Sequence, residues 1–497
     1  MSMLLLSLLS EHLLSENLLL LASLLVFVAI LVTKVGSKLG APSLLLFLLL
    51  GIAVGADGLG FRFDDYEVAE SIGHFAMTII LFTAGLETSL EETRPVIKKG
   101  LTLSTLGVFL TVTLTGVFIW LLNGRSGEIH LLACIMLAAV MGSTDSASVF
   151  SMLREKKLHL REDLAPMLEL ESGSNDPMAY MLTIIMVKFL TTEGLMEQGG
   201  WTLFFAGALV LVIQIVVGVA VGLAVGYAGK WVLEKVSFSG FALTSILILS
   251  MGFLTNGLAS LLHGNGLLAI YITAVIIGNK VKLKQKKEIA NFFDGITWLM
   301  QLLMFLVLGL LARPSQMLHV LLPAIAIGSF MLLIARPASV FLCMLPFKKS
   351  LSFRARLFVS WVGLKGAGPI LFALCPVVAG LERSSEMFNI VFIITLFSLL
   401  LQGTTLRKVA GWLRLTYEET PQAETFGMEI PEEMGFMRDH IVGADELAMG
   451  STLRDLHLPH GVRVMMVRRG ERFLVPHGSM KLEEGDHLVI IIGESDD

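Results

Sequence analysis

The chain has 497 residues, of which 55% are hydrophobic and only 16% are charged, and its mean hydropathy is +0.77. Soluble domains carry about 25% charged residues, so this composition excludes an ordinary soluble protein. Several apolar runs approach or exceed the ~20 residues that cross a bilayer as a helix, and the alternation typical of an outer-membrane barrel is absent. The sequence therefore predicts a polytopic α-helical membrane protein.

Apolar windows between helix breakers predict about thirteen transmembrane helices. The predicted spans cover residues 16–33, 41–56, 69–87, 100–123, 129–150, 164–190, 202–233, 240–260, 265–279, 291–312, 317–345, 356–380 and 387–410. No Lys or Arg precedes Lys34, so the first span lacks the basic start of a cleaved signal peptide, and we expect it to be retained.

The loops between these spans alternate in charge. One set concentrates Lys and Arg, as in residues 280–287, whereas the other is poor in them, as in the acidic segment 55–70. Short cytoplasmic loops are enriched in Lys and Arg, so the pattern predicts an external N-terminus and a cytoplasmic C-terminus. We therefore expect a multi-pass membrane protein with this orientation.

The end of the chain differs from the rest. Residues 1–415 hold 30 Lys and Arg against 25 Asp and Glu, whereas residues 416–497 hold 7 against 17. This change predicts a transmembrane domain over residues 1–412, a linker over 413–430 and a small cytosolic α+β domain over 431–497. Within the cytosolic domain, the pattern predicts a short helix at Ser451–Leu456 and strands at residues 462–467, 472–475 and 488–492.

The three cysteines, Cys134, Cys343 and Cys375, all lie in apolar runs. A buried cysteine in such a run usually packs as a small hydrophobe, and the set does not suggest a disulfide framework.

A polar segment, residues 168–178, interrupts the sixth span. Glu171 and Asn175 are four positions apart, as are Ser172 and Asp176, so each pair stacks on one side of a helix. Glu169 lies about 200° around the helix from Glu171, so these two cannot line one site. Ionisable groups at membrane depth are costly and indicate a functional site, the alternative being a polar helix end at the membrane surface.

Two other spans are broken by polar or flexible residues. The fifth contains residues 142–146, with Asp145, and the twelfth contains residues 363–369, with Lys365. If thirteen spans divide as six, one and six, these breaks occupy corresponding places in two halves. Paired broken helices indicate the ion site of an inverted-repeat transporter, although Gly and Pro also occur in membrane helices for close packing.

Arg336 lies within the eleventh span, where an unpaired guanidinium is costly. Pairing with Glu171 would neutralise both groups and fix the sixth helix against the eleventh, which predicts a supporting role for the pair. Lys188, near the end of the sixth span, can extend to the membrane surface, and we interpret it as structural.

Asp176 is then the candidate ion carrier. One buried carboxylate can hold either a proton or a monovalent cation, and competition for it produces exchange. Thr144, Asp145, Ser172 and Asp176 supply the oxygen ligands that K+ or Na+ prefers. With Glu171 neutralised and Asn175 unable to ionise, one titrating group per cycle predicts electroneutral exchange.

At these residues the sequence resembles a known family. Residues 142–145 and 171–176, Gly-Ser-Thr-Asp and Glu-Ser-Gly-Ser-Asn-Asp, resemble the paired motifs of the cation:proton antiporters of the first monovalent type. The resemblance implies two inverted repeats, a homodimer with an elevator-like core, and Asp176 as the main ion and proton site. Arg336 matches the family arginine of the eleventh span, whereas Lys365 stands where the family generally has Arg, which retains the positive charge but not the planar fork of a guanidinium.

The end of the chain resembles the C-terminal domain of potassium-transport regulators. The similarity lies in residues 453–462 and 485–490. Together the two resemblances indicate the bacterial cell-volume-regulation type, which exchanges K+, or Na+, for H+. A nucleotide is one candidate ligand for this domain, with Arg468 and Arg469 as candidate phosphate contacts. Both arginines also suit a solvated hairpin turn, and no Gly-rich dinucleotide fingerprint is present.

We expect no cofactor, no enzymatic activity and no nucleic-acid partner, since no intramembrane His cluster or nucleophile elbow accompanies the carboxylates. The alternative function is a ligand-gated K+ channel or efflux system controlled by the C-terminal domain, but the chain contains no Thr-Val-Gly-Tyr-Gly selectivity filter. We expect the membrane domain to transport without the residues after Thr416, which would modulate the rate.

Overall fold

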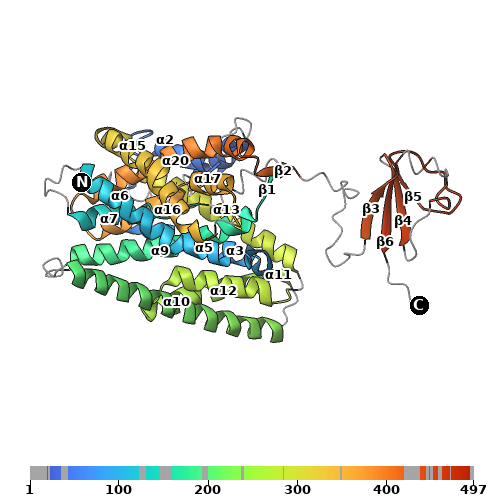
Figure 1. Cartoon of the computed structure of the whole chain (residues 1–497), viewed down its shortest axis with the longest axis horizontal. Coiled ribbons are helices and arrows are strands. Elements are labelled where there is room, and N and C mark those ends of the chain that lie inside the picture. The colour runs from blue at the N-terminus through green and yellow to red at the C-terminus, as the bar shows by residue number, and fades with distance from the viewer. Residues whose placement is uncertain are drawn as a thin grey trace, which may run out of the picture. The chain divides into compact units, whose positions relative to one another are not determined.

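A computed structural model of the chain divides into two compact units, Met1–Tyr417 and Glu418–Asp497 (Figure 1). The structure describes the following residues: 20, 23–34, 43–122, 130–145, 149, 158–192, 200–236, 240–283, 285–347, 350–418, 437–443, 447, 452–456, 462–470 and 472–492.

The first unit is a helical membrane domain, and helical residues occupy each of the thirteen predicted ranges. Seven of the described helices are long and apolar enough to cross a membrane, and shorter apolar helices accompany them. In chain order the helices are Ser23–Lys34, α2 (Ser43–Val54), α3 (Tyr66–Glu87), α4 (Leu90–Thr93), α5 (Ile97–Thr102), α6 (Val108–Leu122), α7 (Leu131–Val140), α9 (Leu164–Thr191), α10 (Gly200–Lys235), α11 (Phe241–Leu261), α12 (Gly266–Lys280), α13 (Lys286–Leu311), α14 (Pro314–Met317), α15 (Leu321–Phe330), α16 (Arg336–Cys343), α17 (Phe353–Trp361), α18 (Ala367–Phe372), α19 (Leu374–Val378) and α20 (Ser384–Trp412).

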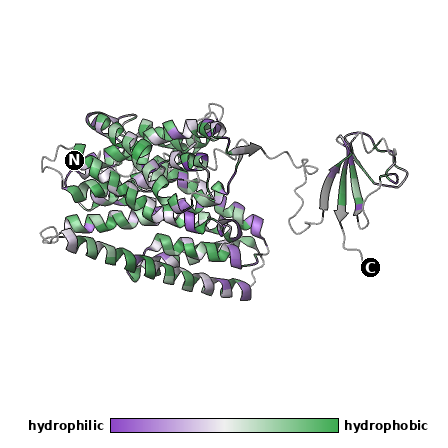
Figure 2. Cartoon of the chain, in the orientation of Figure 1, coloured by the Kyte–Doolittle hydropathy of each residue, from purple (hydrophilic) through white to green (hydrophobic). Residues whose placement is uncertain are grey.

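Hydrophobic residues cover most of these helices (Figure 2). In a bilayer the hydrophobic effect does not distinguish lipid from protein, so close packing decides which faces meet. The helix α10 shows this, because a Cβ added at Gly218, Gly222 or Gly226 would come within 3 Å of Asn265, Ala269 or Ile276. These glycines let α10 and α12 approach closely, while Trp201, Phe205 and other large side chains of α10 stay exposed.

The contacts between helices define two groups. The first helix group contains α2, α3 and α10 to α13, with α3 packed on α12 and α13. The second helix group contains α5 to α7, α9 and α15 to α20, with α7 packed on α6 and α9. Helices of the two groups also contact each other, for example at α3 and α19.

Interruptions occur at matching places in the two halves. The fourth span contains a π-helical turn at Leu103–Gly107, and the eleventh contains one at Met331–Ala335. The fifth span leaves the helix after Val140, and the twelfth leaves it between Trp361 and Ala367. The broken helices predicted for the fifth and twelfth spans are therefore present, and π-turns of this kind are frequent at functional sites.

Two short strands, β1 (Leu158–Leu160) and β2 (Thr416–Glu418), form a small sheet that the sequence did not predict. The second unit contains an antiparallel sheet in the order β3 (Met437–Ile441), β6 (His487–Ile492), β4 (Val462–Arg469) and β5 (Arg472–Leu474). The three predicted strands are confirmed, β3 was missed, and Gly470 adopts φ 59° in the turn between β4 and β5.

The short helix predicted at Ser451–Leu456 is wrong for its described residues, which form a turn. Thr452 makes a β-bridge with Lys481, and its backbone N–H and hydroxyl both donate to Asp455 Oδ2, at 3.1 and 2.6 Å. Local side-chain hydrogen bonds of this kind compete with a helix.

Arg469 belongs to the sheet's own packing. Its guanidinium donates to the buried Asp486 carboxylate at 2.9 and 2.7 Å and to Glu483 at 2.6 Å. Burial raises the pKa of Asp486, but the hydrogen bonds from Arg469 and the Glu483 backbone, together with the charges of Arg469 and His487, outweigh it, and the net pKa is lowered. Arg469, a candidate phosphate contact in the sequence, is therefore already paired with the carboxylates of Asp486 and Glu483.

Candidate ion-binding site

The site lies where the two broken helices meet. The backbone N–H of Asp145 donates to the carbonyl of Leu364 at 2.8 Å, which joins the interrupted fifth and twelfth spans. The Nζ of Lys365, itself buried, donates to the carbonyl of Ser143, also at 2.8 Å. Backbone groups released by the two breaks thus find partners across the crossing, as they must where no water is available.

Gly366 permits this close approach. A Cβ at this position would lie 2.8 Å from the Cβ of Asp145 and even closer to its carboxylate. The backbone of the twelfth span therefore lies directly against the Asp145 side chain, and only glycine leaves the space.

The helix α9 holds the non-helical segment after α7 by three contacts to Thr144. The hydroxyl of Ser172 donates to the Thr144 carbonyl at 2.8 Å, and the Asn175 amide donates to Thr144 Oγ1 at 2.5 Å. The Thr144 N–H lies 3.4 Å from Asn175 Oδ1. Asn175 is fully buried, and its amide faces both the N–H donor and the hydroxyl acceptor of Thr144. The amide therefore positions the segment that contains Thr144.

Asp176 faces the same segment one position further along α9. The hydroxyl of Ser143 donates to its Oδ1. Asp176, Asp145, Thr144 and Ser172 all line one cavity of about 120 Å³, large enough for a cation together with water molecules. The two walls of candidate ligands, predicted from separate segments, are adjacent in the fold.

Glu171 points elsewhere. Its carboxylate forms the predicted ion pair with Arg336, and both side chains are buried, at 2% and 7% exposed. Arg336 directly follows the π-turn of the eleventh span, and Gly363 lies beside its guanidinium. The pair links α9 to α16 outside the cavity that Asp176 lines.

The structure adds residues that the sequence did not single out. Ser143 contacts Asp176 directly, while Glu169, Glu87 and Gln301 line the same cavity. The sequence predicts that Glu169 and Glu171 cannot line one site. In the structure Glu169 lines the Asp176 cavity, whereas Glu171 pairs with Arg336 outside it. The sequence signal for Ser143 is its place beside Thr144 in the polar segment that interrupts the fifth span.

Family models and curated relatives match most of the chain. The family model of the transmembrane region of sodium/hydrogen exchangers matches residues 22–412. The family model of the TrkA-C domain matches residues 437–496. The K(+)/H(+) antiporter NhaP2 of Shewanella oneidensis is 38% identical over 479 residues, which cover 95% of this chain and 80% of that protein. The K(+)/H(+) antiporter NhaP of Alkalimonas amylolytica is 36% identical, over 91% of this chain and 74% of that protein.

Among solved structures, the sodium proton antiporter MjNhaP1 of Methanocaldococcus jannaschii has a TM-score of 0.64 at 20% identity, over 77% of this chain and 97% of that one. It shares the fold. Together with the family model and the K(+)/H(+) antiporters at 36–38% identity, this fold defines a membrane antiporter of monovalent cations and protons. The chain belongs to the sodium/hydrogen exchanger family and carries a TrkA-C domain at its C-terminal end.

Proposed function

We propose that the chain exchanges K+ for H+ across the membrane, with Na+ as a second substrate, and that Asp176 carries both ions in turn. The observation that carries this proposal is the Asp176 carboxylate in a cavity lined by the oxygen atoms of Thr144, Asp145 and Ser172. Relatives named K(+)/H(+) antiporters support K+, and a Na(+)/H(+) antiporter of Halobacillus aidingensis is 26% identical over 79% of this chain.

The exchange follows from competition for one carboxylate. When Asp176 holds a proton, the cavity loses the charge that attracts a cation, and when a cation binds, the proton leaves. The hydroxyl of Ser172 donates to the Thr144 carbonyl and keeps lone pairs for the ion. Arg336 neutralises Glu171, and Asn175 does not ionise, so one proton is exchanged for one cation and the cycle is electroneutral.

Further features belong to the same proposal. Lys and Arg in alternate loops support an external N-terminus and a cytoplasmic C-terminus in the bacterial inner membrane. The family resemblance supports a homodimer within the lipid bilayer. The TrkA-C domain is proposed to regulate the rate in response to a small ligand, with a nucleotide as a candidate, and transport itself needs no cofactor.

Exchange can be measured in proteoliposomes that hold a pH gradient and a pH-sensitive dye. We expect K+ to dissipate the gradient with wild-type protein and not with Asp176→Asn, because the amide neither binds a proton nor attracts a cation. The matched control is Asp163→Asn, at the start of α9 and outside the cavity, which should exchange normally. Full exchange by folded Asp176→Asn, or no response to either K+ or Na+ in the wild type, would contradict the proposal.

A further inference from the structure

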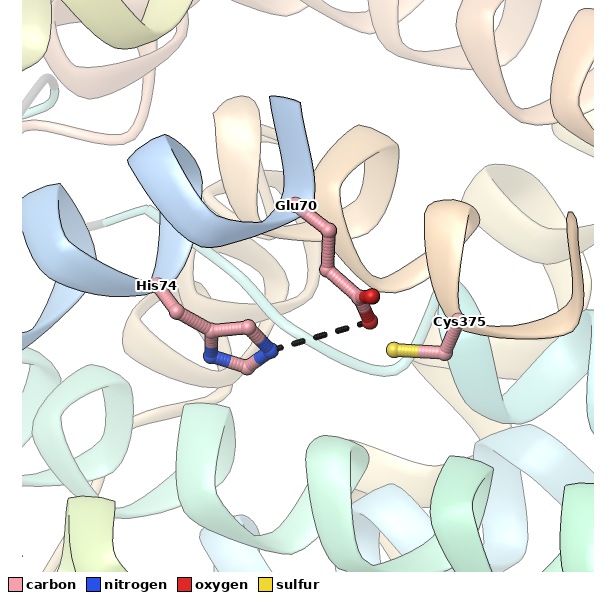
Figure 3. Close-up of side chains that lie close together, drawn as sticks. All are labelled: Glu70, His74 and Cys375. Carbon is pink, nitrogen blue, oxygen red and sulfur yellow. Dashed lines mark ion pairs between the residues drawn. The ribbon is translucent and has the colours of Figure 1, made fainter. Parts of the chain in front are cut away.

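A second cluster of polar side chains lies away from the Asp176 cavity. Glu70 and His74 are one turn apart on α3, and Cys375 is on α19 (Figure 3). One ligand atom from each, a carboxylate oxygen, an imidazole nitrogen and the sulfur, all lie within 4.8 Å of one another. The three side chains point toward a common space in Figure 3.

The donor set suits a transition metal. Sulfur, imidazole and carboxylate are the ligands of Zn²⁺, whose bond lengths place neighbouring ligand atoms of a tetrahedral site about 3.3–3.6 Å apart. His74 Nε2 and Glu70 Oε1 are 3.9 Å apart, so small side-chain rotations bring them to that spacing. Three protein ligands leave a fourth position for water.

The cluster has the buried and accessible parts that a metal site needs. Cys375 is 5% exposed, which protects a thiolate, whereas the side chains of His74 and Glu70 are 30% and 21% exposed. His74 also borders an open cavity of about 690 Å³, through which a hydrated ion can approach. Its ring packs edge-on against Tyr180, with 5.1 Å between centroids, which limits its rotation.

The position of the cluster gives it a consequence for transport. Helix α3 belongs to the first helix group and α19, part of the broken twelfth span, belongs to the second. Alternating access requires one set of helices to move against the other. A metal coordinated by both groups opposes that movement.

We propose that Glu70, His74 and Cys375 form a Zn²⁺ site that joins the two helix groups and stops exchange when it is filled. Binding replaces the thiol proton of Cys375, which is released to water, and a water molecule completes the coordination. The site itself is independent of the transport proposal, whereas the inhibition rests on the exchange proposed above. With the proposed orientation, the start of α3 and the end of α19 are both at the external face, so external zinc would inhibit.

Binding is tested on the full-length protein in detergent by calorimetric titration with Zn²⁺ and by Co²⁺ absorption. We expect a thiolate-to-cobalt charge-transfer band, and an affinity at least about tenfold lower in both His74→Gln and Cys375→Ser. The matched controls are His263→Gln, which borders the same open cavity as His74, and Cys134→Ser, a buried free cysteine in α7. Equal zinc binding by all four variants, or no cobalt–thiolate band in the wild type, would overturn the site.

Inhibition is tested in proteoliposomes. We expect Zn²⁺ to block wild-type exchange, EDTA to restore it, and His74→Gln to exchange at the same rate with or without zinc. If saturating zinc leaves wild-type exchange unchanged, the proposed inhibition is wrong. The binding experiment then decides by itself whether the zinc site exists. Hydrogen–deuterium exchange separates this failure from failure of the transport proposal, because zinc should slow amide exchange in α3 and α19 even in a protein that moves no cation.

Discussion

At the scale of single residues, the membrane domain separates a buried ion pair from the carboxylate that we propose as the ion carrier. Glu171 and Asp176 are five positions apart on α9, and the turn of the helix directs them to different surroundings. Glu171 pairs with Arg336, whereas Asp176 accepts a hydrogen bond from Ser143 and faces the cavity. A hydroxyl leaves the carboxylate able to bind an ion, but a guanidinium would hold it permanently.

This division predicts how the ion pair responds to mutation. Breaking a buried pair leaves one uncompensated charge, so Glu171→Gln or Arg336→Gln should each lower the free energy of unfolding by about 3–5 kcal/mol. The double variant removes both charges and should recover most of that loss. Thermal unfolding of the purified protein measures all three, and a double variant no more stable than the singles would contradict a role based on charge pairing.

At the scale of elements, the broken fifth and twelfth spans form one unit. The link between Asp145 and Leu364 and the space left by Gly366 depend on both breaks at once. The second break also positions Lys365, whose backbone N–H donates to Ser398 of α20 at 2.9 Å while its Nζ donates to Ser143. A single amine is sufficient for that carbonyl contact, which gives a physical reason why Lys serves here without a planar guanidinium.

The close approach predicts that Gly366→Ala abolishes exchange. The new Cβ would collide with Asp145 and displace it from the cavity, and no rotation of the methyl group relieves the clash. Gly411→Ala is the control, since that glycine of α20 has open space around its Cβ position. Proteoliposome exchange compares the two, and wild-type rates from Gly366→Ala would show that the approach is not needed.

The elements themselves were largely predictable from the sequence. Apolar length located the spans, and polar residues within them located both breaks and the Glu171–Arg336 pair. The ion-site roles stay predictions, but the residues assigned to them do lie together. The sequence does not predict strands β1 and β2, because three residues are too few to show the alternation of a strand. It predicts a helix where the turn after Thr452 lies, because the hydrogen bonds from Thr452 to Asp455 that compete with a helix are not evident from the sequence. Glu87 and Gln301 required tertiary structure, since nothing in their sequence neighbourhoods places them at one cavity.

At the scale of the whole molecule, the proposed ion site and the TrkA-C domain belong to separate units. Every residue assigned to the ion site lies before Tyr417, and the sheet of the second unit has its own small core, which includes Val442, Val467, Leu482 and Leu488. Its Arg469 and Asp486 satisfy each other within that unit.

A chain that ends at Tyr417 should therefore still exchange K+ for H+, at a rate that no longer responds to ligands of the TrkA-C domain. The measurement is the proteoliposome assay on the truncated protein beside the full chain. A truncated protein that is monodisperse and folded but moves no cation would show that the C-terminal domain is required for transport itself.

The hydrogen bond from Asp145 N–H to the Leu364 carbonyl has one more consequence, for evolution. It uses only backbone atoms, so almost any side-chain substitution at either position leaves it in place, Pro at 145 being the exception. This link between the two interrupted spans is therefore independent of the side chains at positions 145 and 364. Ion preference can change by substitutions at the lining residues, one at a time, without rebuilding the crossing.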